Sequence, residues 1–302
     1  MLNQAKTVLL LGLLSALVVG FGALVAPGYL YLFGVLAILM NLGAYFFSDR
    51  IVLRMHGAAE IGERELPWLH ADVAELAAKA GIPKPRVFLI REAQPNAFAT
   101  GRNPEHGVVA VTEGIVALLS RRELRGVLAH EIAHIKNRDI LIASVAAMLS
   151  SMVTYAAQAF GMSSLFGGSQ TDEEGGGASG LLLALLAPIG ATFVQLAISR
   201  SREYVADETG ARLTGDPEAL ASALVKLERG AEQLEMDAQP ATASLFIVNP
   251  LFGQGGMSRW FSTHPETDER VRRLLALRAE LPSPPEARMA EDRMRRIFVG
   301  YR

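Results

Sequence analysis

Two histidines and a glutamate stand in the pattern His-Glu-Ile-Ala-His at residues 130–134. On a helix His130 and His134 lie one turn apart on the same face, so both imidazoles can reach one zinc ion. Glu131 projects beside them, where its carboxylate can take a proton from water. The surrounding RELRGVLAHEIAHIKNRD has no proline and a single glycine, which favours a helix. The spacing predicts a zinc site with a general base.

A catalytic zinc ion takes a third protein ligand and leaves its fourth position to water. The chain has no cysteine, so the third ligand must be His, Asp or Glu. The best candidate is Glu203 in SRSREYVADETGA, and Asp207 follows one turn later on the same face. Asp207 could accept the free N–H of a ligating imidazole and fix its tautomer. The alternative is a solvated helix face in which these carboxylates pair with Arg200 and Arg202.

Long uncharged apolar runs surround these motifs and indicate a membrane protein. The four runs are residues 8–26, 29–47, 140–160 and 181–198. Each is close to the ~20 residues that a helix needs to cross the hydrocarbon layer. The alternatives are a cleaved signal peptide for the first run and buried core helices for the last two. The composition, with 50% apolar and 20% charged residues, agrees with a membrane protein.

The distribution of charge predicts the orientation in the membrane. The loop 161–180 is rich in glycine and acidic residues and has no Lys or Arg, whereas basic residues flank the other ends of the runs. The positive-inside rule therefore places both termini and both polar segments in the cytoplasm. We expect a membrane hairpin over 1–47, the first part of a protease domain over 48–139, a second hairpin over 140–198 with the external loop, and the second part of the domain over 199–302. Because both hairpins return to the same side, Glu203 lies at the depth of His134.

Local patterns predict the elements of the cytoplasmic domain. Helices are expected over 66–80, from Glu123 onward into the third apolar run, over 217–235 after a cap at Asp216, and over 266–281. Residues 85–91 form a buried strand, while 96–101 and 108–112 form a hairpin. Residues 238–256 are expected to be a loop. The predicted fold is a mainly α membrane protein with four spans and a cytoplasmic α+β domain that contains a small antiparallel sheet.

The combination of HEIAHIKNRD and SREYVADETGA across a membrane hairpin resembles the HtpX-type membrane-bound zinc metalloproteases, within the gluzincins. NAFATG before the metal helix and STHPETDERV near the end extend the resemblance over nearly the whole chain. It implies a zincin-like domain in the bacterial inner membrane, His130, His134 and Glu203 as ligands of one zinc per chain, and Glu131 as the catalytic glutamate. It also implies ATP-independent proteolysis of damaged or misassembled membrane proteins in the lipid bilayer.

Two further predictions concern the substrate. His264, whose backbone is held extended by Pro265, is the candidate donor to the oxyanion, because the resemblance places this stretch near the zinc. The alternative is a segment that caps the following helix. The NAFATG stretch predicts a strand edge on which a peptide docks, formed by Asn96, Ala97, Phe98 and Ala99. The alternative is an ordinary hairpin strand.

A different function class is a membrane scaffold or chaperone with a structural zinc ion. Such a site would be closed by a fourth protein ligand, and the sequence offers no obvious one. The net charge of −2 argues against nucleic acid as a partner. His56, His70 and His106 stand apart from the motifs and are not expected to bind metal.

Overall fold

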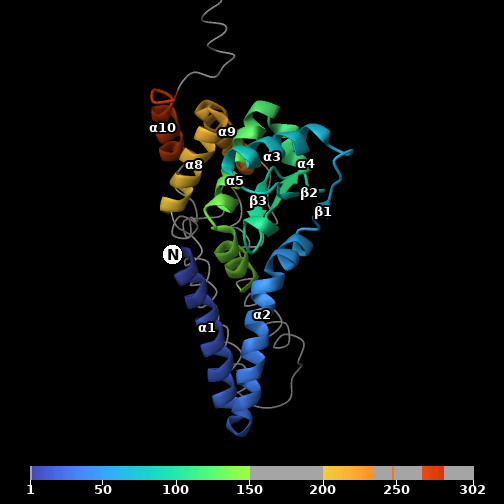
Figure 1. The fold of residues 1–302 in the computed structure, drawn as a ribbon, viewed down its shortest axis with the longest axis vertical. Helices are drawn as coiled ribbons and strands as arrows, with labels where there is room; N and C mark the ends of the chain where they lie inside the picture. The colour runs from blue at the N-terminus through green and yellow to red at the C-terminus, as the bar shows by residue number, and fades with distance from the viewer. Residues whose placement is uncertain (1, 150–199, 234–246, 248–266, 282–302) are drawn as a thin grey trace, which may run out of the picture.

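The structure is a computed structural model that describes residues 2–149, 200–233, 247 and 267–281. The described residues are mostly helical, with one small sheet. A long helical hairpin projects from one end of a domain that contains the sheet and the remaining helices (Figure 1). The N-terminus lies where the hairpin meets the domain, so the hairpin runs out and returns.

The hairpin consists of α1 (Leu2–Val25) and α2 (Leu30–Met55), joined by a short 3-10 turn, Pro27–Tyr29. This confirms the expected pair of helices. Among the described residues, one helix, Pro27–Met55, is long and apolar enough to cross a membrane, and its apolar side chains are mostly exposed. Shorter apolar helices cover Thr7–Gly20 and Ile140–Leu149. The rest of the second hairpin lies outside the described residues, so four spans remain a prediction.

The sheet contains four strands in the order β1-β2-β4-β3. They are β1 (Ala59–Glu60), β2 (Arg86–Ile90), β3 (Ala97–Thr100) and β4 (Val108–Thr112). The expected β3–β4 hairpin is confirmed, but the prediction of an antiparallel sheet is wrong for one pairing, because β2 and β4 are parallel. The fully buried β4 lies between β2 and β3, so β3 is an edge strand. Because β4 runs in the same direction as β2, these two strands pair in parallel.

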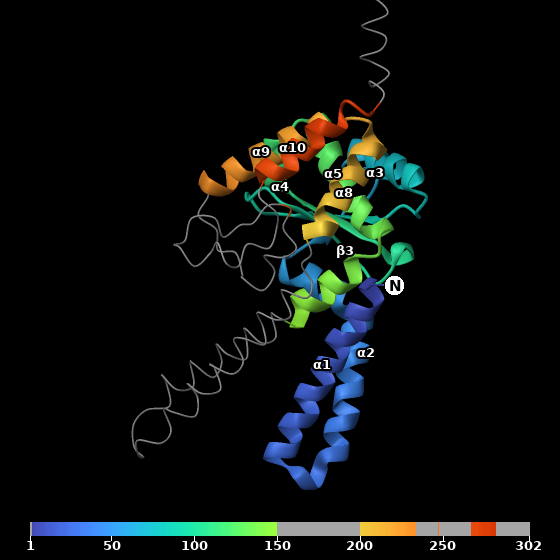
Figure 2. The ribbon, with the colours of Figure 1, turned by 90° about the vertical axis from the view of Figure 1, so that its left-hand side faces the viewer.

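Alternate side chains of the strands enter two different cores. One face of the sheet packs against α3 (Pro67–Ala80) and α5 (Arg121–Lys136) through Val87, Ala97, Ala99, Val109 and Val111. The opposite face packs against the end of α2 and the helix Ile140–Leu149, through a cluster of Phe88, Ile90, Phe98, Val108 and Ala110 with Val52, Leu53 and Ala147. The sheet therefore lies between α5 and the ends of the apolar helices (Figure 2).

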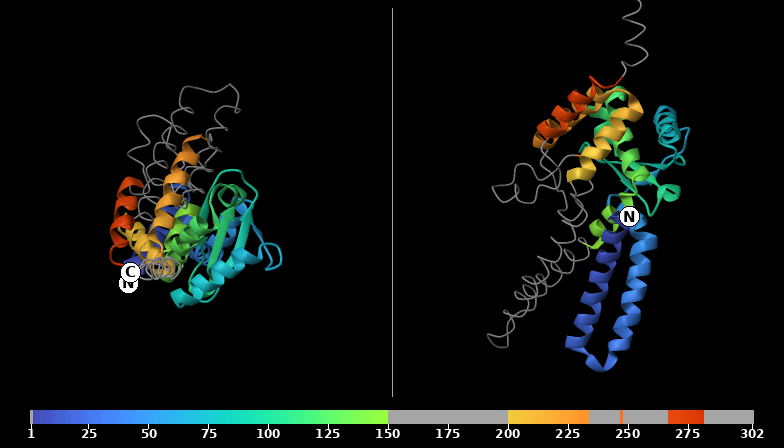
Figure 3. Two further views of the ribbon diagram at one scale, coloured as in Figure 1. Left: turned by 90° about the horizontal axis from the view of Figure 1, so that it is seen from above. Right: turned by 60° about the vertical axis from the view of Figure 1, so that its left-hand side comes forward.

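The helices expected over 66–80, 217–235 and 266–281 are found close to those ranges, whereas the short helix over 113–118 was not predicted. The helices of the domain are α3 (Pro67–Ala80), α4 (Glu113–Leu118), α5 (Arg121–Lys136), α8 (Arg200–Thr214), α9 (Pro217–Gln233) and α10 (Thr267–Leu277). Gly81 ends α3 with a left-handed φ of 73°, which glycine adopts without steric cost. Seen from above, α8, α9 and α10 lie on one side of α5 and the sheet on the other (Figure 3).

The helix expected to run from Glu123 into the third apolar run is interrupted, which corrects that prediction. It ends at Lys136, and Arg138 adopts a φ of 59°, a left-handed conformation that is uncommon outside glycine. The chain becomes helical again from Ile140. This break turns Asp139 back toward the preceding helix, where its N–H donates to the His134 carbonyl at 2.9 Å.

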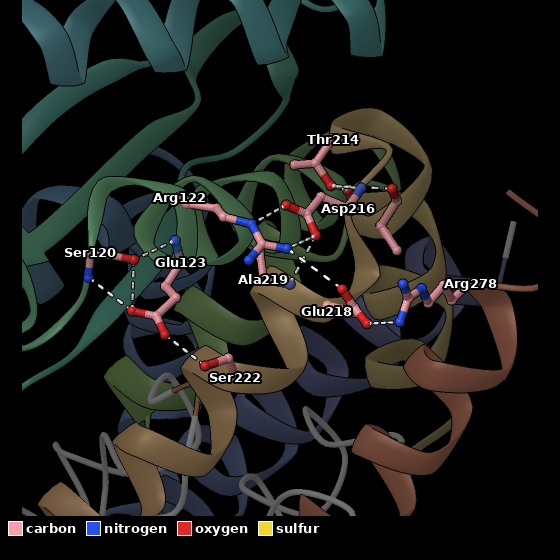
Figure 4. Close-up of polar contacts among 11 residues, drawn as sticks. Ser120, Arg122, Glu123, Thr214, Asp216, Glu218, Ala219, Ser222 and Arg278 are labelled. Atoms are coloured by element: carbon pink, nitrogen blue, oxygen red, sulfur yellow. Dashed lines mark hydrogen bonds and ion pairs between the residues drawn. The ribbon is translucent and has the colours of Figure 1, made fainter. Parts of the chain in front are cut away.

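Polar contacts fix the first turn of α5 against α9 (Figure 4). Ser120 caps α5 in a reciprocal capping box with Glu123. Glu123 also accepts from Ser222 Oγ at 2.6 Å and from Lys226 Nζ at 2.8 Å. Beside it, Arg122 donates two hydrogen bonds to Asp216, which caps α9 as predicted. The start of α5 is therefore anchored both to the start of α9 and to residues one and two turns further along it.

Candidate metal centre

The candidate site lies where α5 and α8 cross. Gly210 of α8 lies against the backbone of α5, and a Cβ at Gly210 would be 2.9 Å from the His130 backbone nitrogen. A side chain there would push the two helices apart. The close crossing brings Glu203, two turns earlier on α8, beside the histidine face of α5.

The structure brings His130, His134 and Glu203 into one cluster whose potential ligand atoms all lie within 4.8 Å of one another. The two Nε2 atoms are 3.1 Å apart. Each carboxylate oxygen of Glu203 lies 3.6 Å from one Nε2, Oε2 from that of His130 and Oε1 from that of His134. Within the part of the chain that the structure describes, this is the one cluster with such geometry.

These separations fit a tetrahedral zinc ion. Zinc bonds of ≈2.0–2.1 Å at tetrahedral angles put neighbouring ligand atoms about 3.3 Å apart. The two Nε2 atoms, 3.1 Å apart, are close to that spacing, and each histidine has a Glu203 oxygen at 3.6 Å, a different oxygen for each. His130 is 1% exposed, whereas His134 and Glu203 are 16% and 12% exposed, so the cluster has one buried side and one more open side.

Asp207 lies beside His130, on the side away from the cluster. Its position one helical turn after Glu203 predicts this contact with a ligating imidazole. Its Oδ1 is 2.9 Å from His130 Nδ1, which leaves Nε2 facing His134 and Glu203. Burial lowers the pKa of His130, but the Asp207 and Glu203 carboxylates outweigh burial and raise it to about 9. The surroundings of this imidazole therefore favour a positive charge, whether a proton or a metal cation.

Arg270 of α10 holds Asp207 in turn. Its Nε and Nη2 donate to the two carboxylate oxygens at 2.8 and 2.7 Å, and its Nη1 donates to the Ile247 carbonyl at 2.9 Å. Both side chains are buried. Burial raises the pKa of Asp207, but Arg270 and His130 outweigh it, so the pKa lies below its ordinary value. Asp207 thus stays ionised opposite His130.

The second histidine has its own carboxylate. Asp139 Oδ2 lies 3.1 Å from His134 Nδ1, and Asp139 is 5% exposed. Both imidazoles therefore have a carboxylate at the nitrogen that faces away from the cluster, an arrangement that fixes the ring orientation of metal-ligating histidines.

Glu131 is 4% exposed and points toward β3, where the Ala99 N–H donates to its carboxylate. Burial raises the pKa of Glu131, opposed in part by the two histidines. A raised pKa makes a carboxylate a better proton acceptor near neutral pH. The strand, the glutamate and the two histidines therefore meet at one place.

Sequence reasoning did not identify Asp139 or Arg270. Asp139 reaches His134 only because the helix breaks at Arg138, which no spacing rule predicts. Arg270 gave a usable signal, because it shares a helix face with Thr267 and Leu274, which are also buried. A charged residue on a buried face needs a partner. His264 lies outside the described residues, so its role remains a prediction.

The chain matches the model of Peptidase family M48 over residues 63–278, which include both halves of the metal cluster. This range covers more than half of the sequence. The chain therefore belongs to peptidase family M48.

Within that family, the curated relatives are named protease HtpX homologs. One from Syntrophobacter fumaroxidans is 51% identical over 281 residues, which cover 91% of this chain and 99% of the relative. Another from Persephonella marina is 51% identical over 289 residues, 93% of this chain and 100% of the relative. The chain is thus an HtpX-type protease, and the resemblance drawn from its motifs is confirmed.

Among solved structures, the chain is similar to the crystal structure of S. mikatae Ste24p. The match has a TM-score of 0.46 at 19% identity and covers 87% of this chain and 65% of that one.

Proposed function

We propose that this chain is a zinc-dependent endopeptidase of the cytoplasmic membrane that hydrolyses peptide bonds in cytoplasmic segments of misfolded or damaged membrane proteins. One zinc ion per chain is held by His130, His134 and Glu203. The observation that carries the proposal is the ligand geometry together with Glu131, a buried carboxylate beside the cluster. Membership of an HtpX-type protease family supports the activity.

Within this proposal, each residue has a distinct task. A zinc ion bound there would polarise the scissile carbonyl and make a neighbouring water a stronger nucleophile. Glu131 takes the proton from the attacking water and returns it to the leaving amine, a role typically worth about 10²–10⁴-fold in rate. His264 donates to the oxyanion, while Asp207 and Asp139 hold the two imidazoles in place.

The test is cleavage of casein by the purified protein in detergent. We expect activity that a chelator abolishes and that added zinc restores. Glu131→Gln should keep the bound zinc but lose turnover by about 10²-fold or more, because the amide cannot accept the proton. Glu92→Gln, at an exposed position, is the matched control and should leave the rate unchanged.

Two results would contradict the proposal. Cleavage that continues in the presence of chelator would exclude metal-dependent hydrolysis. Stoichiometric zinc without any cleavage by the wild type would indicate a structural metal site instead.

A further inference from the structure

The outer edge of β3 has main-chain groups that no other described strand pairs with. The Thr112 N–H donates to the Asn96 carbonyl at 2.9 Å, so Asn96, Phe98 and Thr100 direct their main-chain groups toward β4. By alternation, Ala97 and Ala99 direct theirs to the outer edge. The Ala99 N–H donates to Glu131. Among the described strands, none pairs with the main-chain groups of Ala97 or with the Ala99 carbonyl, so these groups can bind an added strand.

The same strand lies directly on the apolar helices. The Phe98 side chain, 1% exposed, packs with Val52 and Leu53 of α2 and with Ala147. Val52 and Leu53 follow Asp49 and Arg50, the first charged residues after the apolar run of α2. They lie within about 5 Å of that boundary along the helix. The face of the sheet that packs against α2, to which Phe98 belongs, therefore lies about one helical turn above the end of the span.

The C-terminal end of β3 is the end nearest the apolar helices. Thr100 Oγ1 is 2.6 Å from Ser144 Oγ, and a Cβ at Gly101 would lie 3.1 Å from the Ile140 side chain. The Arg102 guanidinium lies over the Phe46 ring, 5.7 Å from its centroid. The other end has different surroundings, because Pro95 and Ala93 line a hollow with Glu113 and Leu118 of α4.

From these contacts we propose that the protease selects juxtamembrane segments. A substrate chain leaves the bilayer beside the Thr100 end of β3, pairs antiparallel with Ala97 and Ala99, and is cut opposite Glu131. The inference rests on the proposed function, because it uses the same site and assumes that α2 spans the membrane.

Strand geometry predicts how far from the span the substrate is cut and in which N-to-C direction its chain runs. An extended chain covers about 3.3 Å per residue, so the short step above the span and the length of β3 together take up about three to eight residues. Antiparallel pairing is slightly more stable per residue than parallel pairing. A chain antiparallel to β3 that enters at its Thr100 end runs away from the membrane from N to C. The favoured substrate is therefore a segment that follows a transmembrane span.

The test uses single-span substrates whose linker consists of identical short repeats, so that sequence preference is the same at every distance. The protease and the substrate are placed together in liposomes, and mass spectrometry maps the first cuts. In one substrate the linker follows the span, and in its matched control the same linker precedes the span. Glu131→Gln supplies the background.

We expect the first cuts to cluster within about ten residues of the span. The linker that follows the span should be cut faster on the order of tenfold, because the reversed chain misaligns one or two main-chain hydrogen bonds. Cuts spread evenly along the repeats would overturn the inference, and equal rates for both substrates would overturn the polarity. Casein in detergent separates the two proposals. If casein is cut in a zinc-dependent way while the linker cuts are uniform, the inference fails and the proposed function stands.

Discussion

At the scale of single residues, each histidine of the metal centre presents its second nitrogen to a carboxylate. Asp207 faces His130 and Asp139 faces His134. The first of these carboxylates is itself held by Arg270, which reaches it from a helix more than sixty residues further along the chain. Arg270 acts on the metal site through Asp207 and His130, so it is a positioning residue.

Arg270→Ala should weaken the metal site and destabilise the fold. Removing the guanidinium leaves the buried Asp207 charge without its partner, which typically costs about 3–5 kcal/mol in unfolding free energy. Loss of such an outer contact typically lowers metal affinity about 10–100-fold. Zinc affinity, measured by competition with a chelating dye, separates the two effects. Arg270→Lys keeps the charge without the bidentate geometry and should bind zinc with intermediate affinity.

Arg272→Ala is the matched control on the same helix, because Arg272 is 72% exposed and pairs with the neighbouring Glu269. It should bind zinc like the wild type. If Arg270→Ala binds zinc as tightly as the wild type and is only less stable, the Asp207–Arg270 pair has a purely structural role.

Helical spacing selected His130 and His134 as one pair and placed Asp207 one turn after Glu203. Glu203 itself was selected by the hairpin topology and by the family resemblance, because spacing alone left a solvated helix face as the alternative. Arg270 depends on a meeting of α8 and α10 that local patterns do not encode. Site residues were therefore predictable where they share one face of a single helix.

At the scale of elements, the capped start of α5 determines where the metal helix lies against α9. Burial raises the pKa of Glu123, but its hydrogen bonds to Lys226, Ser222 and Ser120 outweigh burial and lower the pKa from 4.5 to about 2. A carboxyl whose pKa is lower in the folded state stabilises the fold above its unfolded pKa. This stabilisation is lost as the pH falls from about 4.5 toward about 2.

We therefore expect Glu123→Gln to be less stable than the wild type at pH 6, with a difference that shrinks between pH 4.5 and pH 2. Chemical unfolding in detergent at a series of pH values measures this difference. Glu92→Gln, at an exposed position, should follow the wild-type curve throughout. A constant gap between Glu123→Gln and wild type at all pH values would mean that the carboxylate charge does not contribute.

The element boundaries show what local patterns can and cannot predict. Terminal signals at Gly81 and Asp216 located two helix ends well. The Ser120 cap was not predicted, and α5 begins two residues before the expected Glu123. The break after Lys136 was missed, because it depends on a left-handed Arg138 rather than on glycine or proline. The parallel pairing of β2 with β4 was also missed, because local sequence patterns do not say whether β3 or β4 lies beside β2.

At the scale of the whole molecule, the sheet lies between the metal helix and the ends of the apolar helices. This stacking places the candidate active site close to the membrane surface if α2 spans the bilayer. The number of spans and the orientation still rest on the apolar runs and on the positive-inside rule, because much of the second hairpin lies outside the described residues.

Cysteine labelling tests the orientation directly, because the natural chain has no cysteine. Ser169→Cys places a thiol in the acidic loop, and Arg64→Cys places one on the exposed surface of the domain. A membrane-impermeant maleimide added to intact spheroplasts should label the first and spare the second, and permeabilisation should expose both. Labelling of Arg64→Cys alone would reverse the orientation, and equal labelling in sealed cells would exclude a second membrane hairpin.

The central claim is that His130, His134 and Glu203 bind one zinc ion that serves catalysis with Glu131. The most direct measurement is the zinc content of the purified protein by mass spectrometry. We predict one zinc per chain in the wild type and in Glu131→Gln, and a large loss in Glu203→Ala. A wild type without zinc, or a Glu203→Ala variant that retains all of its zinc and its activity, would contradict the account.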